Sequence, residues 1–516
     1  PQYMNIRVKN KNYYEIHQMP LEKLFKFSKE LKLLVKDTLF LDSCYNKILN
    51  RLEFLNKVGL QYITMNRVFS TLSAGEAQRT KLSALLGSSI SGLTISLDEP
   101  TRGMHPSEVN SLITVMKELR DRGHTLLVIE HDLDIIKAGD FLVEIGPESG
   151  IHGGEITYEG DYNNFLDSKT HTAKWLSNKR QLIKTTSTTE RYGWLKLIGA
   201  TENNLKGDLL EIPLGNMVGI CGVSGSGKST LIIDTLGRII APQKHTTSVA
   251  YEPIEPGRYQ SIVGVPKNVI IIDQVKKGIS SPYRYFELEK RFISLYSESD
   301  DLVRLELEPE VLKTKCLSCK GKGTIKTDMG FLPSIFSECD ACQGSGHIPE
   351  AWDIRLNGYS LPELFSLTLV EIYELFKEDE YIKSKLRLIL DVGLGYLNLN
   401  QPSFSLSGGE VQRLKIAKEL SKKIPRETLF LLDEPSLGLH MDDISQLMKV
   451  LRMIVAKKNT VIIIEHHPFI LASCDWLIEL GPTGGENGGH IIAKGPPKKF
   501  FDLETPTAPY IKEVLQ

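Results

Sequence analysis

The sequence lacks any apolar run that approaches the roughly 18 residues needed for a membrane-spanning helix. Its apolar runs are short and are bounded by polar or turn residues, as in strands buried on both faces of a parallel sheet. Four such runs are Leu126-Leu127-Val128-Ile129, Val269-Ile270-Ile271-Ile272, Leu429-Phe430-Leu431-Leu432 and Val461-Ile462-Ile463-Ile464. The pattern argues against an integral membrane protein and predicts an α/β fold.

A charge bias is also absent, because 62 Lys and Arg balance 64 Asp and Glu in 516 residues. Such a protein can bind nucleic acid only through a local basic patch. Long heptad runs are absent, which excludes the coiled-coil arms of a chromosome-organising ATPase. Only seven cysteines occur, and four of them form two C-x-x-C units. That spacing is typical of a metal site in a reducing compartment, so we expect a cytoplasmic protein.

The sequence has only one phosphate-binding loop, although it carries two copies of the motifs that accompany such a loop in ABC-type ATPases. Signature segments, Walker B strands and switch histidines each occur twice. The paired positions, 334 or 335 residues apart, are Val58 and Val392, Ser73 and Ser407, Asp98 and Asp433, His131 and His466, and Gly146 and Gly481. This nearly constant separation indicates duplication of one ancestral unit. We expect the loop of the first copy to lie upstream of Pro1, so that the first ATPase head is incomplete.

The phosphate loop lies between an apolar strand, 218–221, and a helix expected from Ser229 onward. In this context glycines let backbone N–H groups wrap a phosphate, and the helix N-terminus adds partial positive charge. Lys228 should reach the β- and γ-phosphates of ATP, and Ser229 should bind Mg²⁺. The residues predicted to hold the nucleotide are Gly222, Val223, Ser224, Gly225, Ser226, Gly227, Lys228, Ser229 and Thr230.

Two carboxylates and a histidine follow other apolar strands and complete the predicted catalytic site. Asp433 can hold Mg²⁺ through water, and Glu434 can deprotonate the attacking water. His466 follows the next strand and can sense the γ-phosphate. Gln274 follows the strand that ends at Ile272 and is expected near the metal and the water. We therefore predict Glu434, His466 and Gln274 as catalytic residues.

Each signature segment begins a predicted helix. The segments 72–76 and 406–410 both place a serine and free backbone N–H groups at a helix N-terminus, which suits a γ-phosphate. ABC ATPases hydrolyse ATP between the loop of one half and the signature of the other. Ser73 and Gly75 of the first signature are therefore predicted to close the nucleotide site.

A four-cysteine module lies between the phosphate loop and the second signature. Its predicted ligands are Cys316, Cys319, Cys339 and Cys342. Each C-x-x-C unit is followed by a Gly-x-Gly turn, and four thiolates suit tetrahedral zinc; the alternative is an empty pair of reduced knuckles. The lysines of this module are Lys313, Lys315, Lys320, Lys322 and Lys326. They could bind DNA phosphates, or they could only be solvent-exposed residues of a hairpin. Their charge favours neither interpretation.

These features together resemble the UvrA family, the damage-recognition ATPases of bacterial nucleotide excision repair. The resemblance rests on the loop at 222–229, the cysteine module after it, and Phe331-Leu332-Pro333 inside that module. Gly59-Leu60 and Gly393-Leu394 precede the two signatures, and Gly-Pro and Gly-Gly tails follow both Walker B lobes. The resemblance extends over essentially all 516 residues.

The resemblance implies tandem ABC-type P-loop heads in an α/β fold, the first head incomplete, with helical signature lobes and an inserted zinc ribbon. It implies ATP, Mg²⁺ and Zn²⁺ as cofactors, and ATPase activity without nuclease activity of its own. It also implies a DNA partner and a homodimer. If the module lysines contact DNA, these contacts would be mainly to phosphates and would depend little on sequence. A UvrB-like partner would dock on a domain upstream of Pro1.

The sequence departs from the family pattern in the segment 275–284, which has fewer arginines, and in the first signature. The turn after the first Walker B strand, 101–105, differs from its copy at 436–440. Three functions therefore stay open: damage recognition in nucleotide excision repair, a UvrA-like paralogue that confers resistance to DNA-binding drugs, and a non-repair ABC ATPase.

The expected organisation follows the order of the motifs. It comprises a first signature lobe at 1–90, a first Walker B lobe at 91–186, the loop-bearing lobe of the second head at 187–309, the zinc module at 310–350, a second signature lobe at 351–422 and a second Walker B lobe at 423–516.

Overall fold

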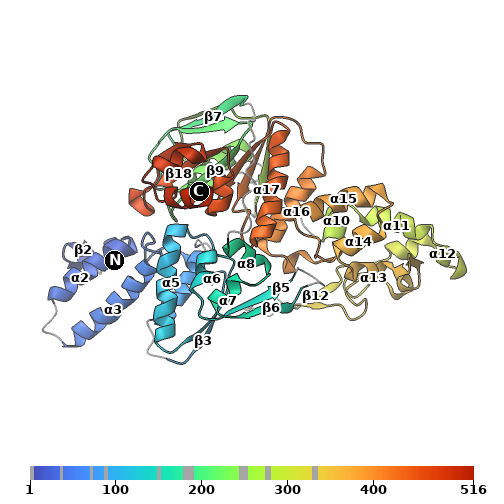
Figure 1. Cartoon of the computed structure of the whole chain (residues 1–516), viewed down its shortest axis with the longest axis horizontal. Helices are drawn as coiled ribbons and strands as arrows, with labels where there is room; N and C mark the ends of the chain where they lie inside the picture. Colours follow the sequence, from blue (N-terminus) through green and yellow to red (C-terminus); the bar gives the residue numbers. More distant parts are fainter. Residues whose placement is uncertain are drawn as a thin grey trace. The chain divides into compact units, whose positions relative to one another are not determined.

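The computed structural model describes residues 5–34, 39–69, 72, 74–86, 91–147, 153–177, 191–242, 254–273, 281–327 and 335–516 (Figure 1). The chain divides into two compact units. The first unit comprises Pro1–Val143, Tyr158–Ile272 and Pro425–Gln516, and the second comprises Glu144–Thr157 and Asp273–Ile424. Within the described residues, no helix is both long and apolar enough to cross a membrane.

A six-stranded sheet forms the centre of the first unit, in the order β11-β16-β17-β9-β18-β19. Its strands are β9 (Met217–Gly222), β11 (Asn268–Ile272), β16 (Thr428–Asp433), β17 (Thr460–Ile464), β18 (Trp476–Gly481) and β19 (His490–Gly495). All neighbours pair in parallel except β18 and β19, which are antiparallel. The apolar runs at 269–272, 429–432 and 461–464 are thus confirmed as strands of a parallel sheet. Because the carboxyl ends of parallel strands share one edge, the segments after β9, β16 and β17 meet there.

Helices and a second sheet pack around these strands. The helical elements are the π-helix η4 (Thr230–Gly237), α9 (Arg238–Ile240), α17 (Met441–Ala456), α18 (Pro468–Ala472), η9 (Gly485–Asn487), η10 (Pro497–Asp502) and α19 (Ala508–Leu515). The second sheet is antiparallel, in the order β10 (Ser261–Val263), β7 (Gly193–Ile198) and β8 (Leu210–Leu214). The apolar faces of both sheets and of η4 form one buried cluster.

The helix after the phosphate loop differs from the expected α-helix. It is π-helical over Thr230–Gly237, with wider turns than an α-helix. The Thr235 hydroxyl donates to the Thr230 carbonyl oxygen at 2.8 Å, across five residues. This side-chain bond adds to the backbone hydrogen bonds of the helix.

The first-copy part of the same unit has its own core, centred on fully buried residues such as Val58, Leu112 and Leu119. Its elements are β1 (Arg7–Val8), β2 (Lys11–Asn12), α1 (Tyr13–His17), α2 (Leu21–Leu34), α3 (Leu39–Lys57), α4 (Ala74–Leu86), β3 (Thr94–Asp98), α5 (Pro106–Asp121), β4 (Thr125–Ile129), α6 (Leu133–Ala138), α7 (Tyr162–Leu166) and α8 (His171–Leu176). Strands β3 and β4 pair in parallel, so the run at 126–129 is also a strand. Strands β5 (Leu142–Gly146) and β6 (Glu155–Gly160) form a separate pair.

The second unit is mainly helical and contains the cysteine module. Its elements are α10 (Pro282–Tyr285), α11 (Glu289–Ser297), α12 (Asp300–Arg304), η6 (Pro309–Lys313), β12 (Thr324–Thr327), β13 (Ile335–Glu338), η7 (Pro349–Trp352), β14 (Arg355–Leu356), β15 (Tyr359–Ser360), α13 (Leu361–Ser366), α14 (Leu369–Leu375), α15 (Glu380–Asp391), η8 (Ser403–Ser405) and α16 (Gly408–Leu420). The second signature begins α16, where the Ser407 side chain caps the backbone N–H of Glu410. The predicted helix start at this signature is confirmed.

Truncating a core residue of β16 tests the central place of this strand. Leu431 is fully buried in the cluster shared by the two sheets. We expect Leu431→Ala to lower the free energy of unfolding by about 2–5 kcal/mol, through lost burial and a residual cavity. Denaturant titration measures the change. Met453→Ala, at a side chain that is 48% exposed, is the control and should shift stability by less than about 0.5 kcal/mol. Equal effects of the two changes would contradict the described core.

Candidate nucleotide site and metal centre

The phosphate loop connects β9 to η4 and encloses the side chain of Lys228. The Lys228 ammonium donates to the carbonyl oxygens of Gly222 at 2.8 Å and Val223 at 2.9 Å. Burial lowers the pKa of Lys228, and the carboxylate of Glu108 opposes this shift. The ammonium thus already lies within the loop, where it can exchange carbonyl oxygens for phosphate oxygens.

Two loop glycines are required by close approaches. Gly222 has φ +130°, and a Cβ atom there would lie 2.0 Å from the Leu480 carbonyl oxygen. Gly225 has φ +70°, and a Cβ atom there would lie 2.8 Å from the Tyr62 ring. Because any larger residue would collide with neighbouring atoms and adopt a disfavoured φ, these positions suit glycine alone.

Backbone and side-chain donors hold the rear of the loop. Asn204 Nδ2 donates to the Gly225 carbonyl oxygen at 3.0 Å, and the Gly485 N–H donates to the same oxygen at 3.1 Å. The Gly489 N–H donates to the Ser226 carbonyl oxygen at 3.1 Å. Gly489 belongs to the Gly-Gly tail that contributed to the sequence resemblance, and it therefore supports the phosphate loop. The contribution of Asn204 had no local sequence signal.

The predicted carboxylates lie at the end of β16. Asp433 is the last residue of that strand. Glu434 has φ +47°, a strained conformation for a residue with a side chain, and its N–H donates to the Ile464 carbonyl oxygen at 2.9 Å. Burial raises the pKa of Glu434, and the charges of Lys228 and Arg102 lower it. The carboxyl group therefore holds a proton more readily than an exposed glutamate does.

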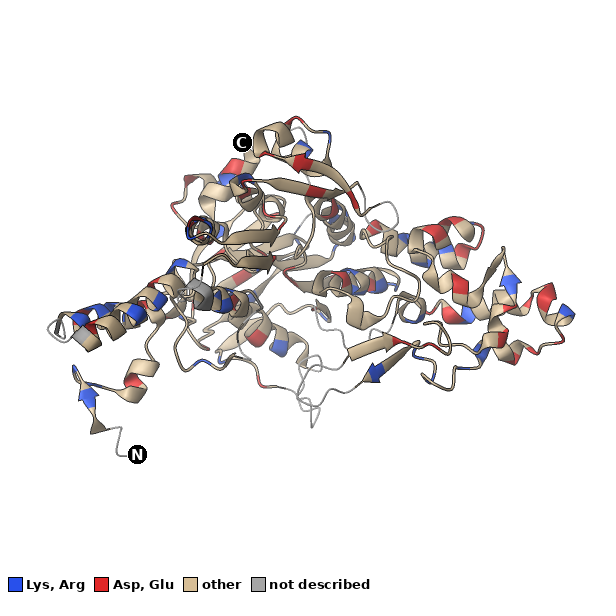
Figure 2. Ribbon diagram, turned by 90° about the horizontal axis from the view of Figure 1, so that it is seen from below, with Lys and Arg blue, Asp and Glu red and all other residues tan. Residues whose placement is uncertain are grey.

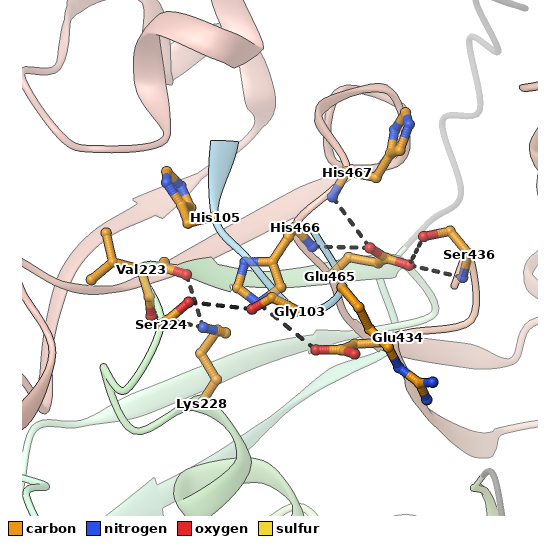
Figure 3. A network of polar contacts seen from close by, with 12 residues as sticks. Gly103, His105, Val223, Ser224, Lys228, Glu434, Ser436, Glu465, His466 and His467 are labelled. Carbon is orange, nitrogen blue, oxygen red and sulfur yellow. Dashed lines mark hydrogen bonds and ion pairs between the residues drawn. The ribbon is translucent and has the colours of Figure 1, made fainter. Parts of the chain in front are cut away.

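His466 lies beside Glu434, as Figure 3 shows, with Nε2 3.8 Å from Oε1. Its side chain is buried, and this burial places the pKa of His466 well below its usual value; the charge of Lys228 acts in the same direction. The imidazole is therefore neutral near pH 7, and the contact with Glu434 is not an ion pair. The structure brings these two predicted catalytic residues together.

Glu465 organises the switch and the turn after Glu434 (Figure 3). One of its carboxylate oxygens accepts from the backbone N–H of Ser436 at 3.0 Å and from its hydroxyl at 2.5 Å. The other accepts from the backbone N–H groups of His466 at 2.9 Å and His467 at 3.2 Å. The sequence prediction missed Glu465, although its signal was a glutamate directly before each switch histidine.

The first copy reaches this site through the turn after its own Walker B strand. The Ser224 hydroxyl in the phosphate loop donates to Glu108 Oε2 at 2.6 Å and lies 3.2 Å from the Gly103 carbonyl oxygen. A Cβ atom on Gly103 would lie 3.7 Å from Glu434 Oε1. The turn of the first copy therefore contacts the phosphate loop and lies beside the predicted base.

The first signature packs against that same turn. Gly75 is buried, and a Cβ atom there would lie 2.2 Å from the Arg102 carbonyl oxygen. The signature residue Glu76 accepts a hydrogen bond from the Tyr62 hydroxyl, whose ring lies on the loop at Gly225. Of the other predicted site residues, Ser73 and Gln274 lie outside the described part of the chain.

The four module cysteines converge at one point in the second unit. Their Sγ atoms all lie within 4.8 Å of one another. Cys316 and Cys339 are 3.9 Å apart, and Cys319 and Cys342 are 3.6 Å apart. Tetrahedral zinc with Zn–S bonds of about 2.3 Å requires Sγ atoms about 3.8 Å apart, so the geometry fits zinc.

Backbone donors and a hairpin surround these thiolates. The Gly323 N–H donates to Cys319 Sγ and the Gly346 N–H donates to Cys342 Sγ, both at 3.2 Å. Strands β12 and β13 pair in antiparallel register between the two knuckles. The segment at 328–334, which includes the Phe-Leu-Pro motif, lies outside the described residues.

All five lysines of the module are exposed: Lys313, Lys315, Lys320, Lys322 and Lys326. Acidic residues also occur here; Glu310, for example, lies 3.7 Å from Lys313. Figure 2 shows Lys and Arg interspersed with Asp and Glu along the described residues. Any basic surface of this module is therefore confined to the neighbourhood of these lysines.

Comparison with known proteins finds similar sequences and a similar solved structure, although no family model matches the sequence. The chain is 37% identical over 525 residues to UvrABC system protein A of Thermus thermophilus, covering 99% of this chain and 55% of that protein. The corresponding protein of Aquifex aeolicus is 37% identical over 527 residues, covering 99% of this chain and 56% of that protein. A crystal structure of UvrA2 from Deinococcus radiodurans matches with a TM-score of 0.89 and 31% identity, covering all of this chain and 65% of that chain.

The match in sequence extends over nearly the whole chain, and the match in structure confirms the expected α/β fold of ABC-type ATPases. The chain spans about half the length of the curated relatives it matches. With its phosphate loop, duplicated Walker B turns and four-cysteine cluster, this chain is a homologue of the UvrA proteins over 99% of its length.

Proposed function

We propose that the chain binds and hydrolyses ATP and uses this cycle in DNA damage recognition within nucleotide excision repair, with DNA and a UvrB-like protein as partners. The observation that carries the ATPase part is the contact of Ser224 with Gly103 and Glu108. It joins the phosphate loop of one copy to the Walker B turn of the other copy beside Glu434. The repair role rests on the family, whose matched members are named as parts of the UvrABC system.

The loop side of the site would bind the nucleotide. Lys228 would release the carbonyl oxygens of Gly222 and Val223 and donate to the phosphates. Ser229 and Asp433 would hold Mg²⁺, which neutralises the charge on the phosphate oxygens when bound. Gln274 is proposed to lie at the same metal, and Ser73 and Gly75 are proposed to close the site from the first copy.

Glu434 would act as the general base. Its carboxylate would take a proton from the attacking water, and a raised pKa makes it a better acceptor near neutral pH. The neutral His466 can donate a hydrogen bond to the γ-phosphate without adding a full charge. Glu465 fixes His466 through its backbone N–H, so the sensor and the base keep a constant spacing.

The cysteine module would bind zinc and contact DNA. Its exposed lysines lie in a small segment that contains the hairpin of β12 and β13. Their contacts with DNA would be made to phosphates rather than to bases. Binding of this kind depends little on sequence, as suits a protein that must act in any sequence context. The repair role therefore agrees with the charge distribution of the module.

Substitutions of Lys228 and Glu434 separate nucleotide binding from hydrolysis. We expect Lys228→Ala to abolish ATP turnover, because the loop loses its only ammonium. Glu434→Gln should still bind ATP but lower kcat by roughly 10²- to 10⁴-fold, the usual contribution of a general base. Steady-state turnover and equilibrium nucleotide binding measure the two effects.

The pH profile provides the control for the role of Glu434. Because its pKa is raised, the acid limb of kcat in the unmodified protein should lie above pH 4.5, where the carboxylate protonates, and Glu434→Gln should lack this limb. Turnover at the unmodified rate in either variant would contradict the assignment of that residue.

Replacing one thiolate tests the metal centre. We expect Cys339→Ser to reduce bound zinc from about one ion per chain to far less, because structural zinc needs four strong ligands. Elemental analysis of the purified protein measures the zinc content. Cys44→Ser is the matched control, since Cys44 is a half-buried free cysteine in α3. Unchanged zinc in Cys339→Ser, or equal loss in both variants, would count against the site.

Neutralising three lysines tests the DNA contact. The triple change Lys320→Gln, Lys322→Gln and Lys326→Gln should weaken DNA binding and reduce the slope of log affinity against log salt by up to about 3. Titrations of labelled duplex at several salt concentrations measure both quantities.

The matched control changes three other exposed lysines, Lys377, Lys422 and Lys423, and has the same effect on net charge. It should leave the salt slope nearly unaltered. Equal slopes for the two triple variants would show that the module only supports the surrounding helices.

A further inference from the structure

Two matching hydrogen bonds link the Walker B turn of each copy to a helix of the other copy. His105 Nε2 lies 3.0 Å from Thr507 Oγ1, and His440 Nε2 lies 3.1 Å from Thr172 Oγ1. Both histidines and both threonines are 335 positions apart in the sequence. The bonds are therefore equivalent under the duplication and run in opposite directions.

The neighbours of His105 define its protonation state. The backbone N–H of Ser107 donates to His105 Nδ1 at 3.2 Å, and the Ser107 hydroxyl lies 2.7 Å from the same nitrogen, so Nδ1 is assigned as the acceptor of both. The proton therefore lies on Nε2, which donates to the Thr507 hydroxyl. His105 is fully buried; burial, aided by the charge of Lys228, lowers its pKa to about 3. The neutral imidazole keeps this hydrogen bond at neutral pH.

Thr507 is fixed to the sheet that carries the phosphate loop. The fully buried Glu479 accepts from the Thr507 N–H at 2.8 Å and from the Thr505 hydroxyl at 2.5 Å. Glu479 lies in β18 directly beside Cys221 of β9, one residue before the loop begins. The start of α19 is thus held at a constant position relative to the loop.

His105 in turn fixes the segment that touches the loop. It is the N-cap of α5, and Glu108 Oε2 accepts from the His105 N–H at 3.0 Å. The same oxygen accepts from the Ser224 hydroxyl. Gly103, whose carbonyl oxygen is near Ser224, lies two residues before His105. An unbroken series of hydrogen bonds therefore runs from Thr507 through His105 and Glu108 to the phosphate loop.

We propose that His105 and Thr507 are positioning residues that hold the Gly103–Glu108 turn of the first copy against the phosphate loop, so that α19 sets the geometry of the ATP site. The proposal rests on the ATP hydrolysis proposed above. His105 acts through Gly103 and Glu108 rather than on the nucleotide. The pair belongs to tertiary packing, because 402 residues separate its members.

Two single substitutions remove the bond in different ways. Thr507→Val keeps the shape of the side chain but removes the hydroxyl. His105→Asn keeps an N-cap acceptor for α5 but is too short to reach Thr507. Each should lower kcat by roughly three- to tenfold, the effect of one net hydrogen bond, with KM changed less than about twofold. Thr507→Ser should restore turnover.

The double variant and a matched control distinguish positioning from general destabilisation. The double variant should be no slower than either single variant, because one bond is lost in all three. Thr428→Val is the control: its hydroxyl is also fully buried, and it donates to the Pro425 carbonyl oxygen at 2.8 Å at the opposite end of β16. It should lose stability while kcat stays within about twofold of the unmodified value.

Unmodified kcat in Thr507→Val or His105→Asn, additive losses in the double variant, or an equal loss in Thr428→Val would overturn the proposal. Failure of the proposed ATPase function gives a different result, namely no turnover in the unmodified protein. Hydrogen exchange still tests the pair in that case. Thr507→Val should accelerate exchange at the amides of Ser107 and Glu108 by several-fold, and Thr428→Val should not; equal exchange in the two variants would refute the pair.

Discussion

The hydrogen bond from the Ser224 hydroxyl to Glu108, with the Gly103 carbonyl oxygen close by, is the contact on which the candidate site depends. Ser224 belongs to the phosphate loop, and Gly103 and Glu108 belong to the other copy of the repeat. This contact places the loop against the turn whose Gly103 lies beside Glu434. Two short polar groups therefore join two separately packed cores at the point where the chemistry is proposed to occur.

The turns after the two Walker B strands have the same backbone conformation and the same hydrogen bonds. Glu99 and Glu434 have φ angles of +46° and +47°, and each N–H donates across to the next strand at 2.9 Å. Such a conformation costs about 1–3 kcal/mol, and the surrounding bonds offset it. A glutamate before each switch histidine, Glu130 or Glu465, accepts from the backbone N–H of Thr101 or Ser436. The same polar network in each copy therefore stabilises the strained conformation of Glu99 and of Glu434.

The cysteine module of the second unit differs from the rest of the chain because it has few apolar side chains to bury. Four thiolates within 4.8 Å of one another replace a hydrophobic core there. Backbone N–H groups of Gly323 and Gly346 stabilise two of the sulfurs. The hairpin of β12 and β13 can therefore be exposed, and Phe336 stacks on Phe404 next to the second signature, with ring centroids 4.6 Å apart. The cysteine cluster and the signature lobe are physically continuous in this unit.

The sequence by itself determined the features that depend on neighbouring residues. Strand β16, the loop at 222–230 and the four cysteines followed from local period and spacing. The π-helical turns at Thr230–Gly237 were not foreseen from the sequence. Only the tertiary structure brought Tyr62, Glu108 and Thr507 to the site, since each contact joins residues more than 100 positions apart. Such contacts leave no periodic signal in the chain, because packing of whole elements creates them.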